Sequence, residues 1–408
     1  MCAKTTAETN LLAEIATRSR DLVSFDEAEI GSKIASLGEE QLLSLVKLQE
    51  VHGACLDRIL RVQSSLESTF TEKQEIIRMM LACTIAQVPM IILGPPGTAK
   101  SALVRAFCQG MGLRETHDKI ERFEASLQEA LRTNRQEAAR GDTPRAGVSL
   151  RKRPLFEYLV TRYTTPEEIL GTANIDAMLT LSLFYRQSEG MLPASQIAFL
   201  DEIFKANSAI LNSLLSIISE RIYYNAGRAF DVDLLMVFGA SNEAPEGEDL
   251  RALYDRFPIR TVSEPVRDDH VPELLRSSIG MAYRQGVAPG GDGAAGIPRL
   301  CSVNDFRLLS RLSFVMFGGQ STLNDASSSG GGFNFLLEFR HLFMTLREEF
   351  HISDRTPERL IRVAGALALL DRVKQLQPAH LRVFKYCAPD AESARVLADI
   401  VEETIAGL

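Results

Sequence analysis

Residues 90–110 have the sequence MIILGPPGTAKSALVRAFCQG, and this stretch decides the fold. Its first four residues, Met90 to Leu93, form an apolar run typical of a strand that is covered on both faces. The segment GPPGTAKS (94–101) then breaks the run, and residues 101–110 have the apolar spacing of a helix, with Gly110 and Gly112 to end it. The sequence therefore predicts a buried strand, a tight loop and a helix in direct succession.

The loop suits a nucleoside triphosphate, which needs many short donors that converge on one spot. Glycines leave the backbone N–H groups of residues 97–101 free to surround phosphate oxygens, and the following helix adds the positive end of its dipole. Lys100 would reach the β and γ oxygens, and the Ser101 hydroxyl would bind Mg²⁺. The predicted ATP-binding residues are Gly94, Pro95, Pro96, Gly97, Thr98, Ala99, Lys100, Ser101 and Ala102.

Ala99 departs from the usual phosphate-loop pattern, because it stands where the last glycine is expected. Alanine fits without strain only at negative φ, so we expect Ala99 to keep a negative φ and to narrow the loop conformation. A chance Gly/Pro turn before a helix is the alternative. The strand, the Lys-Ser pair and the helix, all in register, disfavour that alternative.

A second motif, QIAFLDE (196–202), ends a buried strand with two adjacent carboxylates. Ligands of open α/β sheets lie at the carboxyl ends of the strands, so we expect Asp201 to hold Mg²⁺ and Glu202 to polarise the water that attacks the γ-phosphate. A further apolar strand, 234–240, delivers Asn242 to the same edge, where its amide can hold that water. A solvated strand end is the alternative for the acidic pair. Residues 259–262 are predicted to form the last strand.

Composition restricts the class of protein. The chain has 408 residues, 45% of them hydrophobic, which is enough for a large core and two folded parts. A net charge of -8 argues against a general nucleic-acid or membrane-surface binder. The six cysteines form no CxxC pair, and there is no signal-like or membrane-length apolar run. We therefore expect a cytoplasmic protein without a membrane span.

The outer segments are less specific. Residues 1–70 are predicted to form a helical extension that either packs on the core or docks a partner. Residues 114–153 are predicted to be an insertion whose basic tail is a solvated loop, which is favoured over a nucleic-acid arm because no aromatic residues interleave with the arginines. Residues 170–194 would form a hairpin or loop that projects from the core. The Gly/Ser-rich stretches 286–298 and 318–332 are expected to be flexible.

Five ordered blocks carry a resemblance to a known family. They are GPPGTAKS, FEYLVTRYTTPEEILG, FLDEIFKANSAILNSLLSIISER, GASNE and LYDRF, and they resemble MoxR-type AAA+ ATPases, most closely the RavA branch, over roughly residues 60–390 apart from the insertions. Alanine is common in that family at the position of Ala99. The resemblance implies an α/β core over 71–265 with a parallel sheet of order 5-1-4-3-2 and a helical lid over 266–408. It also implies a ring, usually hexameric, with ATP between subunits.

The resemblance also assigns roles to Asn242 as sensor 1 and to Arg256 as an arginine finger that acts on the nucleotide of a neighbouring subunit. A local Asp255–Arg256 surface pair is the alternative for Arg256. For sensor 2, Arg307 and Arg355 compete. Arg355 is preferred, because Ser353 is a natural N-cap that would place Arg355 in the first turn of a lid helix, pointing back toward phosphate.

The function that the resemblance implies is ATP hydrolysis coupled to movement of core against lid, which remodels or activates a client protein, including by cofactor or metal insertion. Von Willebrand A-domain proteins are frequent partners of the family. The D-x-S-x-S match at 325–329 is a coincidence within a Gly/Ser stretch. An ATP-gated assembly scaffold is the alternative, and Glu202, Asn242 and Arg256 disfavour it. A P-loop kinase or GTPase is disfavoured by the Asp201-Glu202 pair and by the absence of an N-K-x-D guanine-reading sequence.

Overall fold

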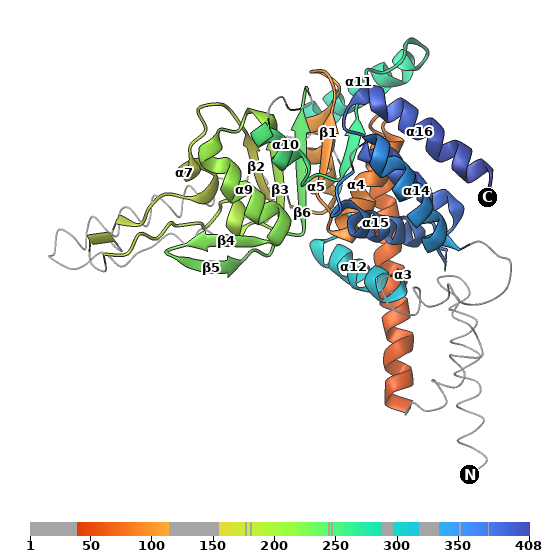
Figure 1. The fold of residues 1–408 in the computed structure, drawn as a ribbon, viewed down its shortest axis with the longest axis horizontal. Coiled ribbons are helices and arrows are strands. Elements are labelled where there is room, and N and C mark those ends of the chain that lie inside the picture. The colour runs from red at the N-terminus through yellow and green to blue at the C-terminus, as the bar shows by residue number, and fades with distance from the viewer. Residues whose placement is uncertain are drawn as a thin grey trace.

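A five-stranded parallel sheet forms the centre of the molecule (Figure 1). The computed structural model describes residues 39–113, 155–175, 178–179, 182–243, 245, 248–287, 297–317, 334–350, 352–373 and 375–408. The strands are β1 (Met90–Leu93), β2 (Leu155–Leu159), β3 (Ile197–Asp201), β6 (Met236–Ser241) and β7 (Ile259–Val262). Their spatial order is β2-β3-β6-β1-β7, which is 5-1-4-3-2 when these strands are counted along the chain. The predicted fold class and strand order are confirmed.

The strand register brings the carboxyl ends to one edge of the sheet. Leu93 pairs with Ser241 on one side and with Val262 on the other, and Leu159 pairs with Asp201. The segments that follow β1, β3 and β6 therefore leave the sheet side by side. We call this the carboxyl edge, and the opposite one the amino edge.

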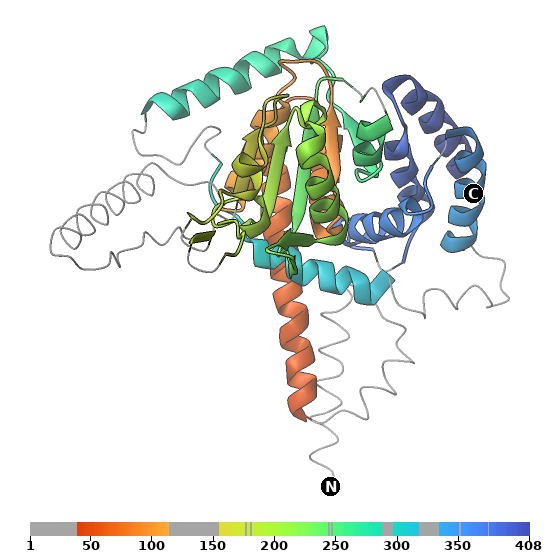
Figure 2. The same cartoon turned by 60° about the vertical axis from the view of Figure 1, so that its left-hand side comes forward.

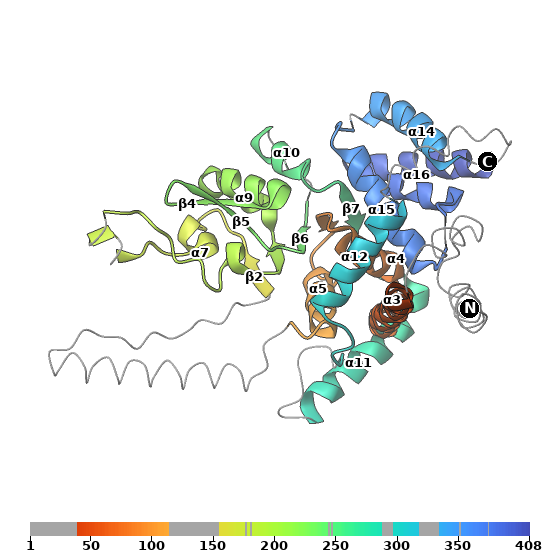
Figure 3. The ribbon, with the colours of Figure 1, turned by 90° about the horizontal axis from the view of Figure 1, so that it is seen from below.

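Two hydrophobic clusters cover the two faces of the sheet. Along β1 the residues alternate, so that Met90 and Ile92 face one cluster while Ile91 and Leu93 face the other. The first face is covered by α3 (Glu39–Glu67), α4 (Gln74–Ala86) and α5 (Lys100–Gly110), and the second by α7 (Pro166–Leu170), α9 (Ser208–Glu220) and α10 (Glu248–Tyr254). Figure 3 shows α5 and α3 on one side of the sheet and α9 and α7 on the other. Asn207 caps α9 by accepting from the Ala209 N–H, as predicted.

The described part of residues 266–408 is helical. It contains the 3-10 segments η3 (Asp268–His270) and η5 (Pro378–Cys387) and the helices α11 (Val271–Val287), α12 (Val303–Phe317), α14 (Phe335–Phe350), α15 (Thr356–Leu370) and α16 (Ala391–Ala406). Helices α12 and α15 pack on α3 and α4 and share one hydrophobic cluster with the sheet. Phe306 of α12, for example, lies 5.9 Å from Phe107 of α5 between ring centroids. The predicted lid therefore rests on the body of the core.

Helix α3 belongs to the predicted N-terminal extension. Its second half, including Ile59, Val62 and Leu66, is buried against the core, which agrees with the first of the two alternatives for this segment. Its first half extends away from the body (Figure 2). Residues 1–38, the insertion 114–153 and most of the two Gly/Ser stretches lie outside the described residues, and so does the 325–329 sequence.

Two hairpins project from the side of the sheet away from the C-terminal helices (Figure 1). The first is the predicted projection within 170–194, where Ala173 bridges Arg186 in antiparallel fashion. The second, β4 (Ile222–Asn225) with β5 (Arg228–Asp231), was not predicted. Its two turn residues, Ala226 and Gly227, both have positive φ, at 52° and 73°, as a type I′ turn requires. The sequence did not predict this hairpin because alanine stands at the first turn position, where asparagine before glycine is the usual signal.

No helix in the described part of the chain combines the length and the apolarity that crossing a bilayer requires.

Candidate active site

The loop after β1 is fixed by the end of β7. Gly94 has φ of 146°, and a Cβ at this position would lie 2.3 Å from the Ser263 carbonyl oxygen, so only glycine fits. The Ser263 N–H donates to the Leu93 carbonyl at 2.7 Å, and its hydroxyl donates to the Thr98 carbonyl at 2.9 Å. The Thr98 hydroxyl donates in turn to the Pro95 carbonyl. Ser263 therefore holds the loop at Leu93, just before Gly94, and at Thr98, just after Gly97.

The expectation for Ala99 was wrong. Its φ is 64°, in the left-handed region, and Gly97 before it has φ of 84°. Left-handed backbone costs an alanine about 1–2 kcal/mol. The loop tolerates this because Ala99 is the N-cap of α5, whose carbonyl accepts the Leu103 N–H at 2.9 Å. The alanine thus keeps the conformation of a glycine.

Ala99→Gly should therefore not destabilise the protein. The substitution removes the left-handed strain of the folded state, which stabilises the protein, but it adds conformational entropy to the unfolded chain, which destabilises it. We expect the free energy of unfolding to rise by ~0–1 kcal/mol. Urea denaturation measures it. The matched control is Ala102→Gly in the exposed face of α5, which should lose about 1 kcal/mol. Equal losses in the two variants would contradict the strain at Ala99.

Lys100 is buried at the carboxyl edge, and its ammonium group lies within the loop. Nζ donates to the carbonyls of Gly94 at 2.5 Å and Pro95 at 2.9 Å, and to Oδ1 of Asn242 at 2.9 Å. Burial lowers the pKa of Lys100, and the carboxylates of Asp201 and Glu202 oppose this shift. The ammonium therefore lies beside the loop amides that would surround a phosphate.

Asp201 joins the loop to β3. The Ser101 hydroxyl donates to Oδ2 of Asp201 at 2.6 Å, and the N–H of Glu202 donates to Oδ1 at 3.1 Å. A hydroxyl and a carboxylate in contact are the hard oxygen ligands that Mg²⁺ accepts alongside phosphate oxygens and waters, so these residues fit that ion. Within the described ranges no group of three His, Cys, Asp or Glu side chains is placed to hold a metal, so the ion would depend on the nucleotide for further ligands.

Glu202 and Asn242 are in direct contact. The Asn242 amide donates through Nδ2 to Oε1 of Glu202, while its Oδ1 accepts from Lys100. Glu202 itself adopts positive φ, at 54°, where β3 ends and η2 (Ile203–Lys205) begins. The structure thus brings together the predicted group of Lys100, Ser101, Asp201, Glu202 and Asn242. One contact was not predicted, that of Lys205 Nζ with Oε2 of Glu202 at 3.3 Å, although their i,i+3 spacing indicated it.

Arg256 lies at the amino edge, since the next strand, β7, starts opposite Met90. The phosphate loop of the same chain lies at the carboxyl edge. Nη1 of Arg256 is 3.4 Å from Oδ2 of Asp255, so the local pair exists, but Nε is buried and has no hydrogen-bond partner among the residues that the structure describes. Arg256 therefore lies at the opposite edge of the sheet from the phosphate loop of its own chain.

The sensor 2 candidates also lie away from that loop. Helix α15 begins at Thr356 with Arg355 as its N-cap, so the predicted cap at Ser353 was wrong by two residues. Arg359, one turn on, donates to the carbonyl of Arg256, which places the start of α15 at the amino edge. Arg355 therefore lies at the opposite edge of the sheet from the phosphate loop of its own chain, because α15 packs on α4, and its predicted role as sensor 2 stays a prediction. Arg307 pairs with Asp233 at 2.6 Å instead.

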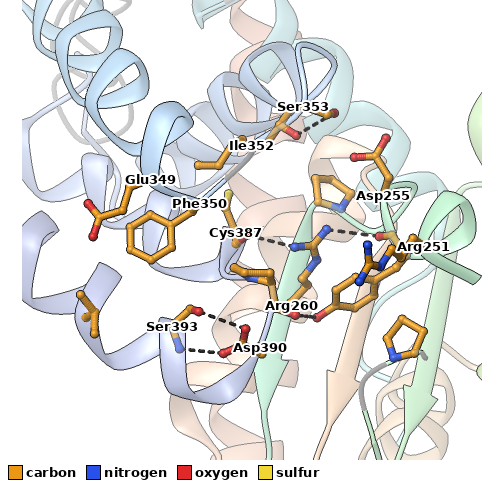
Figure 4. Close-up of a pocket in the computed structure, with 16 residues that line it drawn as sticks. Arg251, Asp255, Arg260, Glu349, Phe350, Ile352, Ser353, Cys387, Asp390 and Ser393 are labelled. Carbon is orange, nitrogen blue, oxygen red and sulfur yellow. Dashed lines mark hydrogen bonds between the residues drawn. The ribbon is translucent and has the colours of Figure 1, made fainter. Parts of the chain in front are cut away.

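A cavity of about 750 Å³ lies at the amino edge between α10, the start of β7 and the C-terminal helices (Figure 4). Asp255, Ser353 and Thr356, which flank Arg256 and Arg355, are among its lining residues. Arg260 crosses the junction and donates to the carbonyls of Cys387 at 3.0 Å and Ala388 at 3.2 Å. The hydroxyl of Tyr254 donates to the Pro389 carbonyl at 2.8 Å. These bonds fix the C-terminal helices to the core beside the arginines.

Comparison with known proteins places this geometry in context. A family model described as the MoxR domain in the MoxR-vWA-beta-propeller ternary systems matches residues 57–127 and 145–288, more than half of the chain. The matched ranges include the phosphate loop, β3, β6 and the Arg256 segment.

Curated relatives include two uncharacterised proteins of Methanocaldococcus jannaschii. MJ0812 is 37% identical over 207 residues, 51% of this chain and 45% of that protein. MJ0079 is 36% identical over 222 residues, 54% of this chain and 48% of that protein. The structural protein ORF618 of Acidianus two-tailed virus is 22% identical over 287 residues, 64% of this chain and 44% of that protein. The chain spans a little under half the length of these curated relatives.

Among solved structures, the chain resembles a protein from Cytophaga hutchinsonii described as a "putative ATPase". The TM-score is 0.57 at 14% sequence identity, over 90% of this chain and 98% of that one. At this identity the likeness supports the fold alone.

Proposed function

Because the chain belongs to the family of MoxR domains found in MoxR-vWA-beta-propeller ternary systems, a group of AAA+ ATPases, we propose that it hydrolyses ATP at the carboxyl edge of its sheet. The observation that carries the proposal is the chain of contacts from Lys100 through Asn242 to Glu202, beside the Ser101–Asp201 pair. A phosphate-binding cation, a candidate base and a pair of magnesium ligands meet there.

Each of these residues has a defined part in hydrolysis. The N–H groups of residues 97–101 bind the β- and γ-phosphates, and Lys100 neutralises their charge. Ser101 and Asp201 would hold Mg²⁺, which supplies positive charge at the β- and γ-phosphate oxygens. Glu202 accepts the proton of the attacking water, and the Asn242 amide, already bonded to Oε1, keeps that carboxylate and the water aligned.

A second copy of the chain is needed to complete the site. Arg256 and Arg355 lie at the amino edge, whereas the phosphate loop lies at the carboxyl edge, so their guanidinium groups would serve the nucleotide of an adjoining protomer. An arginine placed in this way stabilises the charge of the transferring phosphoryl group and accelerates hydrolysis by ~10³–10⁵. We propose a ring, hexameric by resemblance to the family.

Mixing two inactive variants tests this arrangement. Arg256→Ala and Lys100→Ala should each lack turnover alone, and mixed rings should regain part of it, because each subunit supplies what its neighbour lacks. Phosphate release measures the recovery. Mixing Glu202→Gln with Lys100→Ala is the control and should recover nothing, since both defects fall on the same side of the interface. Absence of rescue in assembled rings, with active wild-type protein, would count against an arginine acting between subunits.

The proposed cellular role is the remodelling or activation of a client protein. The family description names a von Willebrand A component, so a vWA-domain protein is the partner we propose. The likeness to the RavA branch and the chaperone-like role, including metal or cofactor insertion, rest on the sequence blocks. The described cysteines, Cys55, Cys83, Cys108, Cys301 and Cys387, are all free and buried, which agrees with the proposed cytoplasmic location.

An ATP-gated scaffold is the second candidate. A scaffold would assemble in the presence of ATP, as a motor does, but it would not hydrolyse the ATP. Steady-state phosphate release, measured with light scattering on the same sample, separates the two. We expect magnesium-dependent turnover that accompanies the assembled species, and assembly without turnover would favour the scaffold.

A further inference from the structure

Arg359 crosses from the C-terminal helices to the arginine-bearing turn of the core. It lies in the first turns of α15, and its Nη1 donates to the backbone carbonyl of Arg256 at 3.2 Å. Arg256 follows α10 and immediately precedes the Phe257-Pro258 segment that leads into β7. This contact joins two segments 103 residues apart in the chain. The position of the Arg256 backbone therefore depends on the position of α15.

Three arginines and two carboxylates lie near Arg359. Among the charged groups, Glu358 and Asp255 favour the charge of Arg359, whereas Arg256 and Arg355 disfavour it; Arg359 in turn disfavours the charge of Arg221 at the end of α9. Burial is the largest effect and lowers the pKa of Arg359. Burial lowers the pKa of Arg221 to about 10, with Arg362 and Arg359 as further causes. These arginines therefore form a cluster with more positive charge than the neighbouring carboxylates Asp255 and Glu358 can neutralise. Its members are Arg221, Arg256, Arg355, Arg359 and Arg362.

The two carboxylates are already shared with other members of the cluster. Asp255 is 3.4 Å from Arg256, and Glu358 is 3.4 Å from Arg362. Gathering partly buried guanidinium groups beside the exposed Arg355 opposes folding, because like charges repel and burial removes hydration. A neutral side chain that kept the bond to Arg256 would cost less. Arg221 and Arg362 donate to carbonyls at the ends of α9 and α4, so an anion from outside the chain is suited to Arg256 and Arg355.

The surroundings of Arg256 agree with that interpretation. Within the described part of the chain its Nε is buried without a hydrogen-bond partner, and its contact with Asp255 is long for an ion pair. The cavity beside it is bounded by Asp255 on the core side and by Ser353 and Thr356 on the α15 side. The arginines that line this cavity are Arg251 and Arg260, so it neighbours the Arg256 turn without enclosing the cluster itself.

We propose that Arg359 is a positioning residue: through its bond to the Arg256 carbonyl it holds Arg256 where that guanidinium, together with Arg355, can reach the triphosphate bound by an adjoining copy of the chain. This inference rests on the proposed function and adds a residue to it. Because Arg359 belongs to α15, any movement of the C-terminal helices carries Arg256 with it. Arg359 thereby couples the position of these helices to hydrolysis at the neighbouring site.

The test compares Arg359→Gln and Arg359→Lys with Arg372→Gln. Arg372 follows the other end of α15, is exposed and pairs with Asp57, so its replacement should leave kcat unchanged. For Arg359→Gln we expect kcat for ATP to fall at least ~10-fold, a part of the arginine-finger effect, with KM changed less than about twofold. Arg359→Lys keeps the charge and should recover part of kcat. It also serves as the folded variant if the glutamine form is unstable.

Subunit mixing separates positioning from a merely structural role. Arg359→Gln retains its own phosphate loop, so mixing with Lys100→Ala, which retains an intact Arg256 and Arg359, should restore turnover as it does for Arg256→Ala. Wild-type kcat in Arg359→Gln while Arg256→Ala is inactive would overturn this inference and leave the proposed function standing. A loss that no mixing restores would overturn it as well. Absence of turnover in the wild-type protein would count instead against the proposed function.

Discussion

Lys100→Ala is expected to abolish measurable ATP binding. The ammonium group lies among the loop carbonyls of Gly94 and Pro95 and within hydrogen-bond distance of Asn242, where the β- and γ-phosphates would meet it. Charge-assisted hydrogen bonds contribute about 1.5–3 kcal/mol each, so loss of two of them weakens binding by at least ~100-fold. Equilibrium titration with a fluorescent ATP analogue measures the affinity.

Two further variants make the Lys100 experiment decisive. Lys100→Met keeps the apolar stem and removes only the charge, so it should bind as weakly as the alanine form. Lys385→Ala removes a lysine that pairs with Glu402 far from the loop, and it should bind ATP normally. Unchanged affinity in both Lys100 variants would exclude the loop as the phosphate cradle.

Glu202→Gln is expected to bind ATP and hydrolyse it at least ~100-fold more slowly, the lower range of general-base effects. Glutamine has the same shape and can still accept the Asn242 hydrogen bond through its carbonyl, but it cannot take a proton from water. Affinity should stay within about threefold, because Glu202 lies beside Asn242 and not among the phosphate-binding amides. Single-turnover phosphate release and the same titration give the two quantities.

Glu403→Gln, at an exposed position of α16, is the matched control and should match the wild-type rate. Turnover near normal in Glu202→Gln would assign the base to another group, and loss of ATP binding would mean that the carboxylate is structural.

Local features of the site were predictable from the sequence because short segments determine them. The apolar runs of β1, β3 and β6 place their following residues at one edge, since parallel strands in register end together. Gly94 lies against the backbone of Ser263, where only a glycine fits, and the Asn207 side chain caps α9. Each of these depends on neighbours in the chain or on strand pairing alone.

The rest depends on packing that no local pattern contains. The sequence indicates that alanine avoids positive φ, but Ala99 adopts it as the N-cap of α5, next to the Thr98 carbonyl that the Ser263 hydroxyl bonds. The S-D-R block indicates a helix start near Arg355, but only the packing of α15 on α4 places that arginine at the amino edge. Arg359 escaped prediction for the same reason, because its partner lies 103 residues away.

A cryo-electron microscopy structure of the assembled protein with MgADP and aluminium fluoride tests the central claim most directly. The account predicts that the phosphate analogue is surrounded by the amides of residues 97–101 and Lys100 of one protomer, with the Arg256 guanidinium of a second protomer within hydrogen-bond distance, about 3 Å. A nucleotide bound away from that loop, or bound there with no guanidinium from another copy beside the analogue, would contradict it.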